Sequence, residues 1–237
     1  MAVEIRASQT YGAYTIDPVV AVPTCQVGDL LIAYLSCWSQ SSKPITTAPE
    51  GWTPLHDQYS TNTNLNPSFH MAYRIADATD AAGGQTYTWD SNLAGHRRWA
   101  GGMLSISGHD AADPIGVSTC TYNADYLVDI LAPSIDTPVD NCLLLYAAAV
   151  ADEVSFTPPE GMAELWDLFA PTGTSNTSHE VAYQTIAAAG ATGTRAANIG
   201  VAGKRSRVAM TAIKPGASEQ HRGLSGLSGL SGLSGMI

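Results

Sequence analysis

Histidines beside aspartates are the first residues whose types could do chemistry. The pairs His56-Asp57 and His109-Asp110 place an imidazole next to a carboxylate, the combination used in general acid–base catalysis. Neighbours in sequence point to opposite faces of a strand, however, and both pairs fall in segments that we expect to be loops. The sequence has no phosphate-binding loop, no GxSxG elbow and no HExxH motif. It therefore predicts no catalytic residue, no cofactor and a protein that is not an enzyme.

Oxygen-bearing side chains form a second group with chemical potential. Asp110, Asp113, Asn123 and Asp125 are residue types that calcium prefers, but the same types cap turns. Carboxylate pairs for glycoside hydrolysis are better explained as loop residues. The cysteines lack CxxC spacing, which argues against zinc, and no secretory signal precedes them. We expect no metal site and four reduced structural thiols: Cys25, Cys37, Cys120 and Cys142.

A polar segment, Ser60–Ser68, is the best candidate for recognition of an outside partner. Its asparagines and hydroxyl groups are rich in hydrogen-bonding capacity, and loops of this kind often carry binding functions. Together with an exposed tryptophan it would suit a carbohydrate, although core packing is the default role of the five tryptophans. The candidate recognition residues are Asn62, Asn64 and Asn66.

Composition excludes several classes of function. The 237 residues include 11 basic and 21 acidic side chains, a net charge of −10, which argues against a nucleic-acid binder. The longest uncharged apolar run, Cys142–Ala151, is too short to cross a bilayer, so no membrane insertion is expected. Only 14% of the residues are charged, which favours extensive contact with other protein.

The elements that must position these residues are strands. Short runs rich in Val, Ile, Tyr, Thr and Ala alternate with Pro, Gly, Asn and Asp clusters, which is typical of an all-β sandwich. The one plausible helix, Met162–Phe169, is more easily explained as an irregular strand or turn. The expected strands are Leu30–Trp38, Phe69–Ile75, Gln85–Trp89, Trp99–Ser107, Cys142–Val150, His179–Ile186 and Arg207–Ile213.

The strands belong to an internal duplication. Asp29–Tyr34 is similar to Asn141–Tyr146, and Pro49-Glu-Gly-Trp52 to Pro159-Glu-Gly-Met162. Proline and glycine suit a tight turn that delivers Trp52 and Met162 to the core. With repeats near 25–108 and 138–214, we expect residues 1–215 to form one jelly-roll-like β-sandwich in which the halves pack together.

The C-terminal segment 216–237 has a different composition. Glycine recurs at every third position, as in collagen, but without proline. One interpretation is a flexible Gly/Ser linker. The other, which we favour, is an extended arm that docks on neighbouring subunits, with a homotrimer as the expected state. The arm residues are Gly223, Leu224, Gly226, Leu227, Gly229, Leu230, Gly232, Leu233 and Gly235.

Basic residues gather just before this arm. Residues 201–222 carry five basic groups and one acidic group, whereas the rest of the chain is acidic. Such a basic joint would settle on an acidic patch of another copy and fix its register. The alternative is an exposed basic strand edge that prevents aggregation. The joint consists of Lys204, Arg205, Arg207, Lys214 and Arg222.

Several of these segments resemble a family of virion structural proteins from tailed double-stranded DNA phages. The similar segments span about 25–215: Val27-Gly-Asp-Leu-Leu-Ile-Ala33, Ala48-Pro-Glu-Gly-Trp-Thr-Pro-Leu55, Ala72-Tyr-Arg-Ile-Ala76, Thr86-Tyr-Thr-Trp89, Leu143–Tyr146, Pro158–Met162 and Ala209–Pro215. The resemblance implies a minor tail or capsid decoration protein, assembled in the host cytoplasm and located in the virion. It implies no catalytic residue. The expected partners are other copies and other virion proteins, and the alternative function is a carbohydrate-binding module for host adsorption.

Overall fold

The computed structural model describes residues 2–38, 44–59, 67–91, 93–125, 127–170, 173, 176–201 and 205–217. Of these residues, 58% are strand and 2% are helix. Its one helix within the described residues is the single turn α1 (Ala78–Ala81). The predicted all-β class is confirmed.

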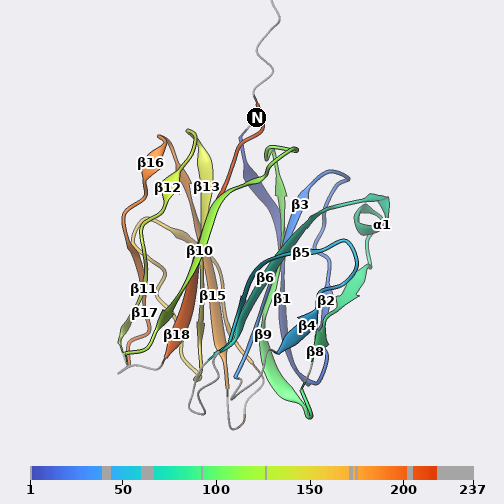
Figure 1. Ribbon diagram of the computed structural model, residues 1–237, viewed down its shortest axis with the longest axis vertical. Coiled ribbons are helices and arrows are strands. Elements are labelled where there is room, and N and C mark those ends of the chain that lie inside the picture. Colours follow the sequence, from blue (N-terminus) through green and yellow to red (C-terminus); the bar gives the residue numbers. More distant parts are fainter. Residues whose placement is uncertain are drawn as a thin grey trace, which may run out of the picture.

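Two five-stranded antiparallel sheets form the centre of the molecule (Figure 1). The two sheets have corresponding strand orders, so the first and second halves of the chain fold in the same way. The first sheet runs β1 (Glu4–Thr15), β9 (Arg97–Ser107), β3 (Leu30–Cys37), β6 (Phe69–Ile75) and β5 (Thr53–Gln58). The second runs β10 (Ile115–Asn123), β18 (Ser206–Ile213), β13 (Cys142–Val150), β15 (Ser178–Ile186) and β14 (Ala163–Phe169).

Short strand pairs cover the outer face of each sheet, at the two sides of Figure 1. Each half therefore winds between its large sheet and its outer strands in a jelly-roll-like manner. We expected one sandwich built from both halves, and the two large sheets, one from each half, do pack on each other through a shared core. The short outer strands add a further layer on each side. The outer pairs are β2 (Val19–Ala21) with β7 (Thr86–Thr88), β4 (Ile45–Thr47) with β8 (Asp90–Ser91), β11 (Asp129–Ala132) with β17 (Arg195–Asn198), and β12 (Asp136–Thr137) with β16 (Gly190–Ala191).

The central strands are apolar on both faces, which explains this layering. In β3, Leu31 and Leu35 face the outer strands of their own half. Leu30 and Ile32 alternate with them and face the second sheet. Because β13 alternates in the same way, the described residues build three hydrophobic clusters: a first outer core, a second outer core and a shared core between the large sheets. Continuous apolar runs are the expected pattern for strands buried on both faces.

The register corrects the repeat alignment by one residue. Tyr34 pairs with Met71, and the equivalent of Met71 in the second half, Val181, pairs with Ala147. Tyr34 therefore corresponds to Ala147 and not to Tyr146, as the sequence comparison assumed. A slip of one residue reverses the face of a strand side chain. Accordingly, Tyr34 lies in the shared core and Tyr146 in the second outer core.

The Pro-Glu-Gly segments are turns, as predicted. The backbone N–H groups of Trp52 and Met162 donate to the proline carbonyl three residues earlier, at 3.2 and 3.0 Å. Gly51 and Gly161 have φ angles of +80° and +77°, which the third position of a type II turn requires. Trp52 and Met162 are buried in the first and second outer cores. Each turn thus delivers a large apolar side chain to the core of its own half.

Candidate assembly site at the junction of the two halves

The chain leaves β18 along a fixed path. The backbone N–H of Lys214 donates to the carbonyl of Pro114 at 2.9 Å, and the N–H of Asp110 donates to the carbonyl of Lys214 at 2.9 Å. The N–H of Gly216 then donates to the carbonyl of Gly108 at 2.8 Å. The segment 214–217 therefore lies antiparallel to the connector between the two halves. Whatever follows Ala217 starts from a defined position.

Side chains reinforce this anchor. The Lys214 ammonium lies 2.5 Å from an Asp113 carboxylate oxygen and 3.9 Å from one of Asp110. The other Asp110 oxygen accepts from the backbone N–H of Ala112 at 2.9 Å. The N–H groups of Ala112 and Asp113, followed by the Lys214 charge, lower the pKa of Asp110. Asp110 is therefore a turn cap within the anchor, the role that its residue type favours.

His109 joins the same connector to the first half. One ring nitrogen lies 2.9 Å from the carbonyl oxygen of Gly28 and the other 3.0 Å from that of Asp110. The pair His109-Asp110 is thus a structural clip, and its two side chains do not form an acid–base dyad.

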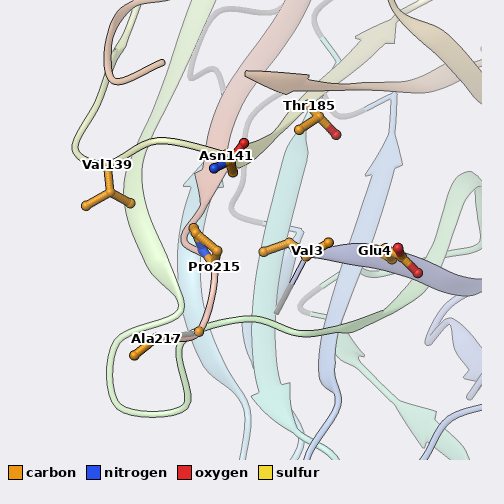
Figure 2. A pocket seen from close by; sticks show the side chains of 9 residues that line it. Val3, Glu4, Val139, Asn141, Thr185, Pro215 and Ala217 are labelled. Atoms are coloured by element: carbon orange, nitrogen blue, oxygen red, sulfur yellow. The ribbon is translucent and has the colours of Figure 1, made fainter. Parts of the chain in front are cut away.

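A pocket of about 580 Å³ opens beside the anchored segment (Figure 2). Both halves and the C-terminal exit contribute to its wall. Its residues are Ala2, Val3, Glu4, Val139, Asn141, Thr185, Pro215, Gly216 and Ala217. Among them Glu4 is the one charged side chain, and no nucleophile stands beside a base. Its lining is mixed: Val3, Val139 and Pro215 are apolar, and Glu4, Asn141 and Thr185 are polar.

The predicted basic joint is not a single patch. Arg207 is buried: its Nε donates to the Pro67 carbonyl at 2.9 Å, and its guanidinium lies 4.9 Å from the centre of the Tyr122 ring. Lys214 is paired with Asp113 at the other end of β18, roughly 23 Å away at 3.3 Å per residue. Arg205 directly precedes β18, which is a central and not an edge strand. Lys204 and Arg222 lie outside the described residues.

Two other sets of predicted residues also lie outside the described ranges. They are the recognition residues Asn62, Asn64 and Asn66, and the arm residues Gly223, Leu224, Gly226, Leu227, Gly229, Leu230, Gly232, Leu233 and Gly235. The end of the recognition segment is held in place, because Pro67 bridges Trp38 and accepts the hydrogen bond from Arg207.

His56 and Asp57 lie in strand β5 and not in a loop, which corrects that expectation. Their side chains point to opposite faces, as neighbours in a strand must. The His56 Nε2 lies 2.7 Å from the Ser118 hydroxyl, across the boundary between the halves, while Asp57 lies 3.7 Å from His70. Burial lowers the pKa of His56. The two side chains therefore serve different interfaces and do not act together.

The candidate calcium ligands do not converge either. Asp110 and Asp113 stand before β10 and Asn123 ends it, where its amide donates to the Leu131 carbonyl at 3.2 Å. Across the described ranges, no group of three or more His, Cys, Asp or Glu side chains is arranged to hold a metal ion. In the same ranges, no helix is long and apolar enough to span a membrane. No family model, curated protein or solved structure matches the chain.

Sequence reasoning missed the residues that build the pocket. Glu4 is the first residue of β1, and Val3 directly precedes it. β1 is an edge strand in which buried and exposed side chains alternate only weakly. Val139 and Asn141 lie in a loop. The sequence alignment placed Asn141 opposite Asp29, whereas the strand register places it opposite Gly28, and both have positive φ, +59° and +90°. An asparagine at a glycine position of a repeat marks a turn that both halves share, here on the wall of the pocket.

Proposed function

We propose that this protein is a non-enzymatic structural component of a virion, a minor tail or capsid decoration protein, that assembles through its C-terminal arm. The observation that carries the proposal is the anchored exit at 214–217, held by three backbone hydrogen bonds and the Lys214–Asp113 ion pair. A firm exit next to an open pocket suits an arm that engages another molecule. The arm's leucine at every third position suits docking on a protein surface.

The solution mass of the intact chain beside a chain ending at Gly216 tests the assembly role. Because the arm is the proposed clasp, we expect a trimer for the intact protein and a monomer for the shortened one. The same number of subunits in both proteins would contradict self-assembly through the arm.

A matched pair of full-length variants separates arm length from arm chemistry. Replacing Leu224, Leu227 and Leu230 by serine should dissociate the trimer, because the apolar edge of the arm is lost. Replacing Ser225, Ser228 and Ser231 by alanine keeps the leucines and should leave the trimer intact. Mass spectrometry of purified phage particles carrying the gene then tests location, and absence of the protein from particles would contradict a virion role.

A further inference from the structure

The two halves differ at the place where the Pro-Glu-Gly turn lies against the strand that follows it. A Cβ added to Gly51 would lie 3.5 Å from Nη1 of Arg74, and a Cβ added to Gly161 would lie 3.5 Å from Nε2 of Gln184. The same spot in each half is therefore approached by one polar side chain from the equivalent strand position.

In the first half this spot is filled. The Arg74 guanidinium donates to the Tyr87 hydroxyl and lies 2.7 Å from Asp77 and 3.2 Å from Asp80. The Tyr87 hydroxyl donates in turn to Asp80 at 2.7 Å. The helix α1, which carries Asp80 and is capped by Asp77, closes the side of the network. All of the strong donors and acceptors at this spot satisfy one another.

In the second half the spot is open. By strand pairing the equivalent of Tyr87 is Ala197, because Val20 pairs with Tyr87 and Ile130 pairs with Ala197. The Tyr87 hydroxyl therefore has no counterpart, and among the described residues the chain passes from β15 to β16 without a counterpart of α1. The result is a pocket of about 390 Å³, near the lower end of the range for small-molecule sites. Its lining residues are Pro159, Glu160, Thr194, Arg195 and Ala196.

Arg195 reaches this pocket with unused donors. Its Nη2 donates to the Gln184 side-chain oxygen at 3.0 Å and its Nη1 to the Thr194 carbonyl at 3.2 Å. Its Nε is buried and has no hydrogen-bond partner. A buried donor without a partner is energetically unfavourable. In the described part of the chain the guanidinium forms no ion pair, in contrast to Arg74 in the first half.

We infer that this pocket binds a neutral saccharide, through adjacent hydroxyl groups that accept from Arg195 and donate to Glu160. The two side chains are of opposite charge, line one pocket and do not pair with each other. A diol satisfies both, because each hydroxyl can accept and donate. An anionic ligand suits the pocket less well, since Glu160 and the net charge of −10 oppose it. The site lies on the described surface of the second half and is independent of the proposed arm.

Ligand-observed NMR with intact protein tests the inference, using galactose, glucose, mannose and N-acetylglucosamine as probes. We expect at least one of them to bind and Glu160→Gln to weaken that binding about tenfold, because the charged acceptor is lost. Glu50→Gln is the matched control, since Glu50 is the equivalent exposed residue of the filled first half, and it should change nothing. Arg195→Lys should also weaken binding, because a lysine cannot reproduce the planar fork of donors.

Three results would overturn the inference. The first is no binding of any neutral sugar, and the second is binding that Glu160→Gln and Glu50→Gln reduce equally. The third is binding of sialic acid or glycine alone, which would assign the pocket to a charged ligand. Glu160 is exposed and makes no contact that the fold depends on, so its variant separates binding from folding. None of these results depends on the oligomeric state, so they leave the arm proposal standing.

Discussion

The two halves share a backbone plan but place different side chains at the same positions of β6 and β15. Phe69 and His179 are equivalent by register, and they stack on each other in the shared core, with ring centres 5.8 Å apart and planes inclined by 9°. The ring nitrogen Nδ1 of His179 accepts from the Trp166 indole N–H at 3.1 Å. An imidazole is therefore tolerated in an apolar interface because a donor of its own half satisfies one nitrogen.

The next position along the two strands shows the opposite outcome. His70 of the first half lies 3.7 Å from Asp57 and packs edge-on against Trp89. Its equivalent, Glu180, is fully buried, and neither carboxyl oxygen has a hydrogen-bond partner. Burial, followed by the charges of Glu164 and Asp167, raises the pKa of Glu180 to about 8. The comparison teaches that the repeated fold constrains shape more tightly than polarity, and that pH will affect the halves differently.

The largest expected effect tests whether the halves are one cooperative unit. Trp89 is fully buried in the first outer core, and truncation to alanine should cost about 3–5 kcal/mol of unfolding free energy. Because the shared core joins the large sheets, we expect chemical denaturation of Trp89→Ala to remain a single transition, shifted as a whole.

Val27→Ala is the control, because Val27 is 67% exposed and such changes stay within about 0.5 kcal/mol. A second transition in the Trp89→Ala variant would show that the halves unfold separately, and would break the comparison.

Glu180 provides the next effect, on the alkaline side. Its pKa of about 8 in the folded protein exceeds the value of about 4.3 in an unfolded chain. Between these values the folded state holds a proton that the unfolded state lacks, so stability falls as pH rises and is lowest above pH 8. Glu180→Gln should remove this slope, a difference of several kcal/mol at pH 9, measured by denaturation at pH 5, 7 and 9.

Glu160→Gln in the same half serves as its control, because Glu160 is exposed and should leave the alkaline slope unchanged. An equally steep slope in the Glu180→Gln variant would show that another group is responsible.

His179 should give a smaller effect of opposite sign. Burial lowers its pKa to about 3, below the value of about 6.5 in an unfolded chain. The unfolded state therefore takes up the proton first, and stability is lost as pH falls from about 6.5 towards 3. His179→Phe, which copies Phe69, should flatten this acid slope.

The same change leaves the Trp166 indole N–H without its acceptor, so it should cost about 1–3 kcal/mol at pH 7. Denaturation across pH 4 to 7 measures both effects, and an acid slope that survives the change would contradict the assignment to His179.

The parts of the fold that could be predicted from the sequence are those encoded by short, local sequence patterns. The Pro-Glu-Gly turns and the strands Phe69–Ile75 and Cys142–Val150 could be placed from sequence, because turn chemistry and apolar runs are local signals. The edge strands β1 and β10 were missed, so the expected repeats 25–108 and 138–214 begin too late. Edge strands with half-buried polar side chains carry a weak pattern.

The pockets depend on contacts that no local signal contains. At the open pocket of the second half, Ala197 stands where the first half has Tyr87, and α1 has no counterpart among the described residues there. The junction pocket needs residues from both ends of the chain to meet. The one-residue error between Tyr34 and Tyr146 has a similar cause, since only pairing with neighbouring strands fixes the register.

The smallest expected effect concerns the turn before each central strand. Gly28 has φ +90° and open space where a Cβ would lie, so Gly28→Ala should cost about 1–2 kcal/mol through backbone conformation alone. Asn141 already holds φ +59° in the second half, because asparagine tolerates this region better than other side chains. Gly28→Asn should therefore cost less than Gly28→Ala, and Asn141→Ala should cost more than Asn141→Gly. Thermal unfolding of the four variants checks this ranking. If alanine is tolerated in one half only, then the two turns have the same backbone shape but differ in how much backbone strain they tolerate.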